Sequence, residues 1–257
     1  MRVIDSHVHF PEDRIIDPGT EPEGGAAAHG SAEAAGTGYT SGRKGQGEGE
    51  SHWLEAEKAR WEAAWRLPAP VAVSKEEGER LWLEEFDGRD WLKAVVFVTA
   101  GSNAFASELV ARGEGRFQGY AHHDPLLPDA AARLERALLD GGLRGYKLLG
   151  PKIERRLDDR SLDGIWEVAQ EREAPVLIHF GIMGGAGGVA NHMNINPLVI
   201  HDVAKRFPRM PIIVPHFGCG YVFETLQLCW ACPNVYIDTS GSNQWMRWVP
   251  YDLDLAT

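Results

Sequence analysis

The sequence predicts an α/β protein folded as a (β/α)8 TIM-type barrel that lacks the eighth strand in this chain. Short apolar segments alternate along the chain with segments of helical periodicity. The apolar segments are continuous rather than alternating, which is typical of parallel strands buried on both faces. The length of 257 residues is common for α/β barrels that form one domain. A doubly wound parallel sheet is the alternative that the same alternation allows.

Seven strands and the helices between them are expected in chain order. Ser74 and Ser161 precede two of the helices and are expected to act as N-caps. The expected strands are Val3–His9, Trp91–Ala100, Phe117–His122, Leu143–Leu149, Pro175–Gly181, Pro211–Gly218 and Val235–Ser240. The expected helices are Ser74–Gly88, Ser102–Arg112, Pro128–Asp140, Ser161–Arg172, Pro197–Phe207 and Gly220–Ala231.

The last segment falls one βα unit short of a closed barrel. After Ser240 the sequence reads as a loop that leads into the first turn of a helix at Leu253. An open parallel edge would expose unpaired backbone groups and favour association. We therefore expect a truncated sequence rather than an open barrel, and association into a homo-oligomer stays open.

An insertion is expected between the first and second strands. Residues 18–50 are rich in Gly, Ala, Glu, Ser and Thr and offer little apolar surface to offset the entropy cost of ordering. Two inserted helices follow at about residues 51–88, and their tryptophans are expected to pack them onto the domain. The prediction is one domain over residues 1–257 with a flexible insertion.

Charge and cysteine content restrict the function classes. The chain has 37 acidic and 26 basic residues, which argues against a nucleic-acid partner. No apolar run reaches the roughly 18 residues of a membrane span and no signal peptide is recognisable, so a cytoplasmic protein with a small-molecule substrate is expected. Cys219, Cys229 and Cys232 are expected to be reduced and packed, with redox or zinc use of the last two as the alternative.

Histidines at strand ends are the candidate functional residues. His7 and His9 share a strand face, so their imidazoles would project side by side as a metal chelate. His179 and His216 lie near the carboxyl ends of the fifth and sixth strands, where the active site of a barrel is built. The four are expected at one mouth, although a buried core histidine is the alternative for any one of them.

The segments IDSHVHF, GYKLLGPK, VLIHFG, IIVPHFG and VYIDTSG, in this order, resemble the amidohydrolase superfamily in its amidohydrolase-related (amidohydrolase 2) branch. That branch includes metal-dependent hydrolases and non-oxidative decarboxylases related to aminocarboxymuconate-semialdehyde decarboxylase. The resemblance covers residues 1–10 and about 90–257. It implies one divalent metal ion, most often zinc, held by His7, His9 and His179, with His216 beside the water or substrate as acid or base.

Other residues are weaker candidates. Lys147 resembles a strand-four lysine that some superfamily members carboxylate, but in this branch a bare lysine that contacts the substrate or a structural carboxylate is expected. His123, which with His122 ends the third strand, and His192 in the glycine-rich loop at 181–196 are candidates for substrate contact.

The family pattern also has an aspartate at the close of strand eight, which touches the metal and acts as a base. No equivalent is present, since Asp238 is expected to hydrogen-bond neighbouring loops, and Asp252 and Asp254 lie in a loop or helix start. The chain as given is therefore expected to lack a proton acceptor, a loss that typically removes about a hundredfold or more in rate and can leave the protein inactive even if it binds metal.

These observations predict a metal-dependent hydrolase of a small cyclic or aromatic carboxylate, lactone or amide. A non-oxidative decarboxylase that uses the same metal site is the first alternative, because the reaction depends on pocket contacts that the sequence does not reveal. A non-catalytic metal-binding or assembly protein is the second alternative, if the chain truly ends at residue 257.

Overall fold

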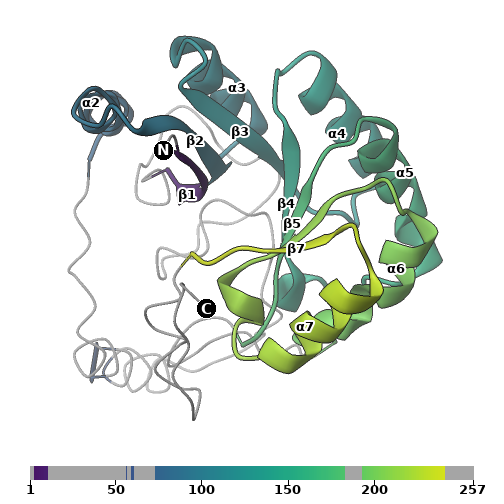
Figure 1. Ribbon diagram of the computed structural model, residues 1–257. Helices are drawn as coiled ribbons and strands as arrows, with labels where there is room; N and C mark the ends of the chain where they lie inside the picture. The colour runs from purple at the N-terminus through teal and green to yellow at the C-terminus, as the bar shows by residue number, and fades with distance from the viewer. Residues whose placement is uncertain (1–2, 11–55, 57–58, 61–72, 183–192, 241–257) are drawn as a thin grey trace. The chain divides into compact units, whose positions relative to one another are not determined.

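The computed structural model describes residues 3–10, 56, 59–60, 73–182 and 193–240 (Figure 1). Over these residues the structure has a seven-stranded sheet in which strands are hydrogen-bonded in chain order, β1 to β7. The pairs β1–β2, β2–β3, β3–β4 and β6–β7 are all parallel. Sequential order confirms the barrel topology over the doubly wound alternative, in which the order reverses. The described residues contain no eighth strand.

The chain divides into two compact units, which we describe separately. The first unit contains residues 1–38, 72–148 and 164–177. The second unit contains residues 39–71, 149–163 and 178–257. The predicted insertion at 18–50 and all but three residues of the predicted helix at 51–67 lie outside the described part of the chain.

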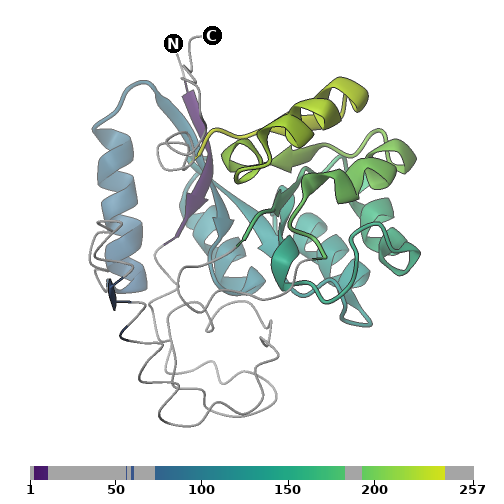
Figure 2. The same ribbon diagram turned by 90° about the horizontal axis from the view of Figure 1, so that it is seen from below.

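The first unit consists of parallel strands with helices packed on them, and α3 and α4 both contact β3. Figure 2 shows β1 beside β2. The elements are β1 (Val3–His9), α2 (Lys75–Asp87), β2 (Leu92–Thr99), α3 (Asn103–Arg112), β3 (Phe117–His122), α4 (Ala130–Leu139), β4 (Gly145–Leu149) and α5 (Asp163–Glu171).

Of the two predicted N-cap residues, the structure confirms Ser74 but not Ser161. The Ser74 hydroxyl accepts a hydrogen bond from the Glu77 amide at 3.1 Å, as predicted. The prediction that Ser161 caps α5 is wrong, because Asp159 accepts the Ser161 amide at 2.8 Å instead. A 3-10 turn, η3 (Arg160–Leu162), then leads directly into α5. The carboxylate lies two residues earlier and therefore begins the helix sooner.

The core of the first unit is an aromatic cluster centred on Phe97. Its ring lies 5.3 Å from Phe10, 5.5 Å from Trp82 and 5.2 Å from Phe117, measured between centroids. These are edge-on arrangements, which aromatic quadrupoles favour. Trp82 thus packs α2 onto β2, as the sequence predicted for the inserted tryptophans. Every residue of β2 except Lys93 is buried, which confirms burial on both faces of the strand.

The second unit contains shorter strands and the turns that follow them. Its elements are η2 (Gly150–Lys152), the end of β5 (Val176–His179) from Ile178 on, η4 (Pro197–Ile200), α6 (His201–Arg206), β6 (Ile212–Val214), η5 (His216–Gly218), α7 (Val222–Ala231) and β7 (Val235–Ile237). Helix α7 packs against β7, η4 and η5. Among the described helices, none has the length and apolar character that a membrane crossing requires.

Strand β6 ends four residues before the position predicted from the sequence. The apolar pattern predicted a strand to Gly218, but every residue from His216 to Gly220 has a positive φ, between 50° and 98°. Left-handed residues turn the chain sharply and cannot continue a strand. The predicted strand end is therefore wrong, and His216 lies in a tight turn that follows β6.

Candidate metal centre

The first feature of the site is the pair of histidines at the end of β1. The Nε2 atoms of His7 and His9 lie 3.2 Å apart. Two imidazole nitrogens bound to one ion at 2.0–2.1 Å with tetrahedral angles would be separated by about 3.3 Å. The His7 ring is buried and the His9 ring is exposed, so one face of the pair is accessible. The spacing fits two adjacent ligands of a single metal ion.

His9 is oriented by a residue of the neighbouring strand. The Thr99 hydroxyl at the end of β2 lies 2.7 Å from His9 Nδ1. A hydrogen bond to the second ring nitrogen fixes the ring plane, as is usual for metal-binding histidines. The contact leaves Nε2 of His9 directed at His7. His9 is therefore held in position before any ion binds.

His122 ends β3, and Lys147 is the middle residue of β4. His122 Nδ1 lies 2.9 Å from the Lys147 carbonyl oxygen, which can only accept, so Nδ1 carries the proton. The Lys147 side chain is fully buried within β4. A lysine at such a position is costly unless neighbouring groups compensate its charge. Its predicted contact with substrate stays a prediction.

His123 is bound on both sides of its ring by the protein. Nε2 donates to the Ala130 carbonyl at 3.0 Å, and Nδ1 lies 3.4 Å from the Asn103 amide nitrogen. The ring also packs against that of Tyr146 in a tilted arrangement, with centroids 4.9 Å apart. Burial lowers the pKa of His123, and the Ala130 carbonyl partly opposes this shift. These contacts favour a packing role at the start of α4 over the predicted substrate contact.

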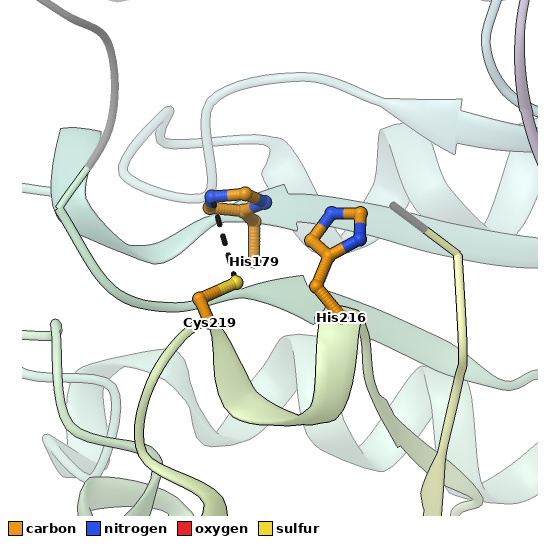
Figure 3. A group of neighbouring side chains, drawn as sticks. All are labelled: His179, His216 and Cys219. Atoms are coloured by element: carbon orange, nitrogen blue, oxygen red, sulfur yellow. Dashed lines mark hydrogen bonds between the residues drawn. The ribbon is translucent and has the colours of Figure 1, made fainter. Parts of the chain in front are cut away.

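The second unit holds a cluster of three metal-binding side chains: His179 at the end of β5, and His216 and Cys219 in the turn after β6 (Figure 3). The Cys219 Sγ atom lies 3.8 Å from His179 Nε2. The two imidazole rings meet edge to face, with centroids 5.1 Å apart. One ligand atom from each of the three lies within 4.8 Å of the others. This donor set suits a divalent transition metal.

His216 is oriented by the loop after β7. Its Nδ1 atom lies 2.6 Å from the Ser240 carbonyl oxygen and 3.0 Å from the Ser240 hydroxyl. Because the carbonyl only accepts, Nδ1 carries the proton and Nε2 of the neutral ring keeps its lone pair. The Asp238 carboxylate in turn accepts a hydrogen bond from the Ser240 amide, and the backbone carbonyl of Asp238 accepts one from the Phe217 amide. The prediction that Asp238 hydrogen-bonds neighbouring loops is confirmed.

The backbone around Cys219 is strained and tightly packed. His216, Phe217 and Cys219 have φ values of 57°, 50° and 53°. Left-handed conformations cost non-glycine residues about 1–3 kcal/mol each, and such strain gathers at functional sites. A Cβ atom on Gly181 would lie 2.6 Å from that of Cys219, so the turn after β5 packs directly on this cysteine.

The sequence brought out most of these residues but missed Cys219. The structure pairs His7 with His9 in one unit and His179 with His216 in the other, whereas His192 lies outside the described residues. The spacing of His216 and Cys219, with two residues between them, is the signal that could have revealed the cysteine. All three cysteines are reduced, as predicted. Burial raises the pKa of Cys229, which agrees with a packed role.

Solved structures with a similar fold include a TIM-barrel protein and two named enzymes. An uncharacterized TIM-barrel protein from Bordetella bronchiseptica has a TM-score of 0.60 and 19% identity, over 96% of this chain and 80% of its own. A probable 2-pyrone-4,6-dicarboxylic acid hydrolase from Acinetobacter baumannii, with citric acid bound, has a TM-score of 0.53 and 12% identity, and the match covers 95% of this chain and 72% of the hydrolase chain. The 5-carboxyvanillate decarboxylase LigW from Sphingomonas paucimobilis has a TM-score of 0.51 and 20% identity, over 65% and 66%.

The sequence identifies the family within this fold class. The model of the amidohydrolase family Amidohydro_2 matches residues 4–254, and the chain belongs to this family. No curated protein sequence matches the chain significantly.

Proposed function

We propose that this protein is a metal-dependent hydrolase that acts on a small cyclic or aromatic carboxylate, lactone or amide. The observation that carries the proposal is the 3.2 Å spacing of the His7 and His9 nitrogens in a chain of the amidohydrolase family. Side by side, two neutral imidazoles would repel through their lone pairs unless one donates to the other or a cation lies between them. A cation is the ligand that the family membership favours.

The proposed metal ligands are His7, His9 and, from the family resemblance, His179. The ion we expect is zinc, because imidazole nitrogens are among its preferred ligands. A divalent ion held by three neutral ligands supplies a Lewis acid with a position open for water or substrate.

His216 is the proposed acid–base residue. Its Nδ1 proton is donated to the Ser240 carbonyl, which leaves Nε2 able to accept a proton from water and later to return it to a leaving group. The same hydrogen bond stabilises the imidazolium that forms after proton uptake. Lys147, from β4, is proposed to bind a carboxylate of the substrate, since an ammonium group buried in the first unit favours a negative partner.

The two named enzymes with similar folds support the substrate class. According to their names, one hydrolyses a pyrone dicarboxylate and the other decarboxylates a carboxyvanillate, and both compounds are cyclic carboxylates. Decarboxylation is therefore the second candidate reaction for this chain. Release of carbon dioxide from a panel of aromatic carboxylates, compared with acid release from lactones, distinguishes the two.

Metal analysis tests the proposal. The His7→Ala/His9→Ala double variant is expected to hold about one equivalent less divalent metal than the wild-type protein. His201→Ala is the matched control, because His201 is an exposed histidine of α6 outside both clusters. Equal metal content in the wild-type protein and the double variant would remove the basis of the proposal.

A further inference from the structure

We propose that His179, His216 and Cys219 form a second, inhibitory metal site that selects thiophilic divalent ions such as Zn²⁺, Co²⁺ and Cd²⁺. The binding part of this inference stands on the cluster alone. The inhibitory part rests on the proposed function, because it requires His216 to act in the reaction.

The geometry of the cluster suits one ion. With Zn–S near 2.3 Å and Zn–N near 2.0–2.1 Å, a sulfur and a nitrogen on one tetrahedral ion are separated by about 3.6 Å. The Cys219 Sγ atom and His179 Nε2 are 3.8 Å apart. No two ligand atoms of the cluster are more than 4.8 Å apart, so their separations exceed the bound value by at most about 1 Å. Small side-chain rotations are enough to close that difference.

His216 and Cys219 are positioned by their surroundings before an ion arrives. The Ser240 carbonyl holds the proton of His216 on Nδ1, so Nε2 presents a lone pair. The left-handed backbone at Cys219 and the close approach of Gly181 fix the thiol against the turn after β5. Cys219 is buried, and the two histidines are half-buried. An ion would thus reach the site from the side of the imidazoles.

The thiol sets the selectivity. Cys219 binds as a thiolate, so each ion that enters displaces one proton from Sγ to solvent, and no electron transfer is involved. Thiolate ligands strongly favour Zn²⁺ and Cd²⁺, whereas Mn²⁺ and Mg²⁺ prefer oxygen ligands. The cluster should therefore bind Zn²⁺ and Cd²⁺ and should not bind Mn²⁺ or Mg²⁺.

Occupation of this site removes two groups from the proposed reaction. A lone pair of His216 that holds an ion cannot accept a proton, and a nitrogen of His179 that holds one ion cannot hold another. Excess zinc should therefore inhibit the enzyme, while excess manganese should not. This behaviour would couple activity to the free zinc concentration.

Cobalt spectroscopy of the full chain tests the binding. Metal-free protein is titrated with Co²⁺, and a thiolate-to-cobalt charge-transfer band is followed in the near ultraviolet. The band is expected in the wild-type protein and to be lost in Cys219→Ser. Cys229→Ser is the matched control, since this second free thiol lies outside the cluster and should leave the band intact. No band in the wild type, or a band that persists in Cys219→Ser, would overturn the site.

Zinc inhibition tests the regulatory part. The Cys219→Ser variant, which lacks the thiolate, is expected to have an inhibitory constant for Zn²⁺ about 100-fold higher than the wild-type protein, with unchanged activity at low zinc. An inhibitory constant equal to that of the wild type would refute the inhibition. The His7→Ala/His9→Ala variant separates the two proposals, because it should keep the cobalt band whether or not His7 and His9 serve the reaction.

Discussion

Removal of the Asn194 side chain should destabilise the protein strongly. Asn194 is fully buried. Its side-chain oxygen accepts from the Leu157 amide at 3.0 Å, and its side-chain nitrogen lies 3.2, 3.1 and 2.8 Å from the carbonyls of Gly150, Ile153 and Arg155. The side chain thus joins the loop after β4 to the segment that leads into η4.

The magnitude of the Asn194→Ala effect follows from these contacts. The amide group has two hydrogens and one accepting oxygen, so about three net hydrogen bonds are lost, each worth about 1 kcal/mol. We therefore expect a loss of about 3 kcal/mol in the free energy of unfolding. In a protein of this length, that is a fall in Tm of about 6–12 °C.

Chemical denaturation monitored by tryptophan fluorescence measures this loss. Asn196→Ala is the matched control, because Asn196 makes one side-chain contact, accepting from the Leu198 amide at 2.9 Å as the cap of η4. That variant should lose about 1 kcal/mol. Similar losses in the two variants would refute the reasoning, since Asn194 would then contribute no more than an ordinary cap.

Four further predictions concern the site and its surroundings. His216→Ala should lower kcat by about 100-fold or more, because the acid–base group is lost; an unchanged kcat in steady-state assays would contradict that role. Lys147→Met should raise KM for a carboxylate substrate by about 10-fold, since a hydrogen bond to a charged group is lost, and an unchanged KM in steady-state assays would exclude the contact. Gly218→Ala should lower the free energy of unfolding by about 2–4 kcal/mol, because the added Cβ would lie 2.1 Å from the Thr225 hydroxyl oxygen. The control is Gly220→Ala, where nothing lies within 4 Å of the added Cβ. In parallel urea titrations this control should lose about 1 kcal/mol. Burial lowers the pKa of His123 in the folded protein, so below the ordinary histidine pKa of about 6.5 the unfolded chain binds more protons, and stability should fall as pH falls. Denaturation at several pH values should show a weaker fall in His123→Gln than in the wild-type protein. Equal slopes in the two proteins would refute the role of His123 in this pH dependence.

Local patterns were enough to predict the framework of the site. Continuous apolar runs gave strands β1 to β7 in order, because burial on both faces removes polar residues from a parallel strand. The positions of His7 and His9 two residues apart followed from the period of a strand. His179 and His216 could be paired because both follow neighbouring strands, and carboxyl ends of neighbouring parallel strands lie at one edge.

The tertiary structure decided what depends on backbone dihedrals and on contacts between distant residues. The sequence HFGCG reads as the end of a strand, but its left-handed backbone ends β6 early and brings Cys219 to 3.8 Å from His179. His123 is occupied by Ala130 and Asn103, which no local pattern relates to it. The sequence by itself therefore determined the order of elements and the histidines at their ends, since these follow from periodicity. Only the tertiary structure decided which distant side chains contact one another, because hydrogen-bond partners and left-handed turns are selected by packing over the whole fold.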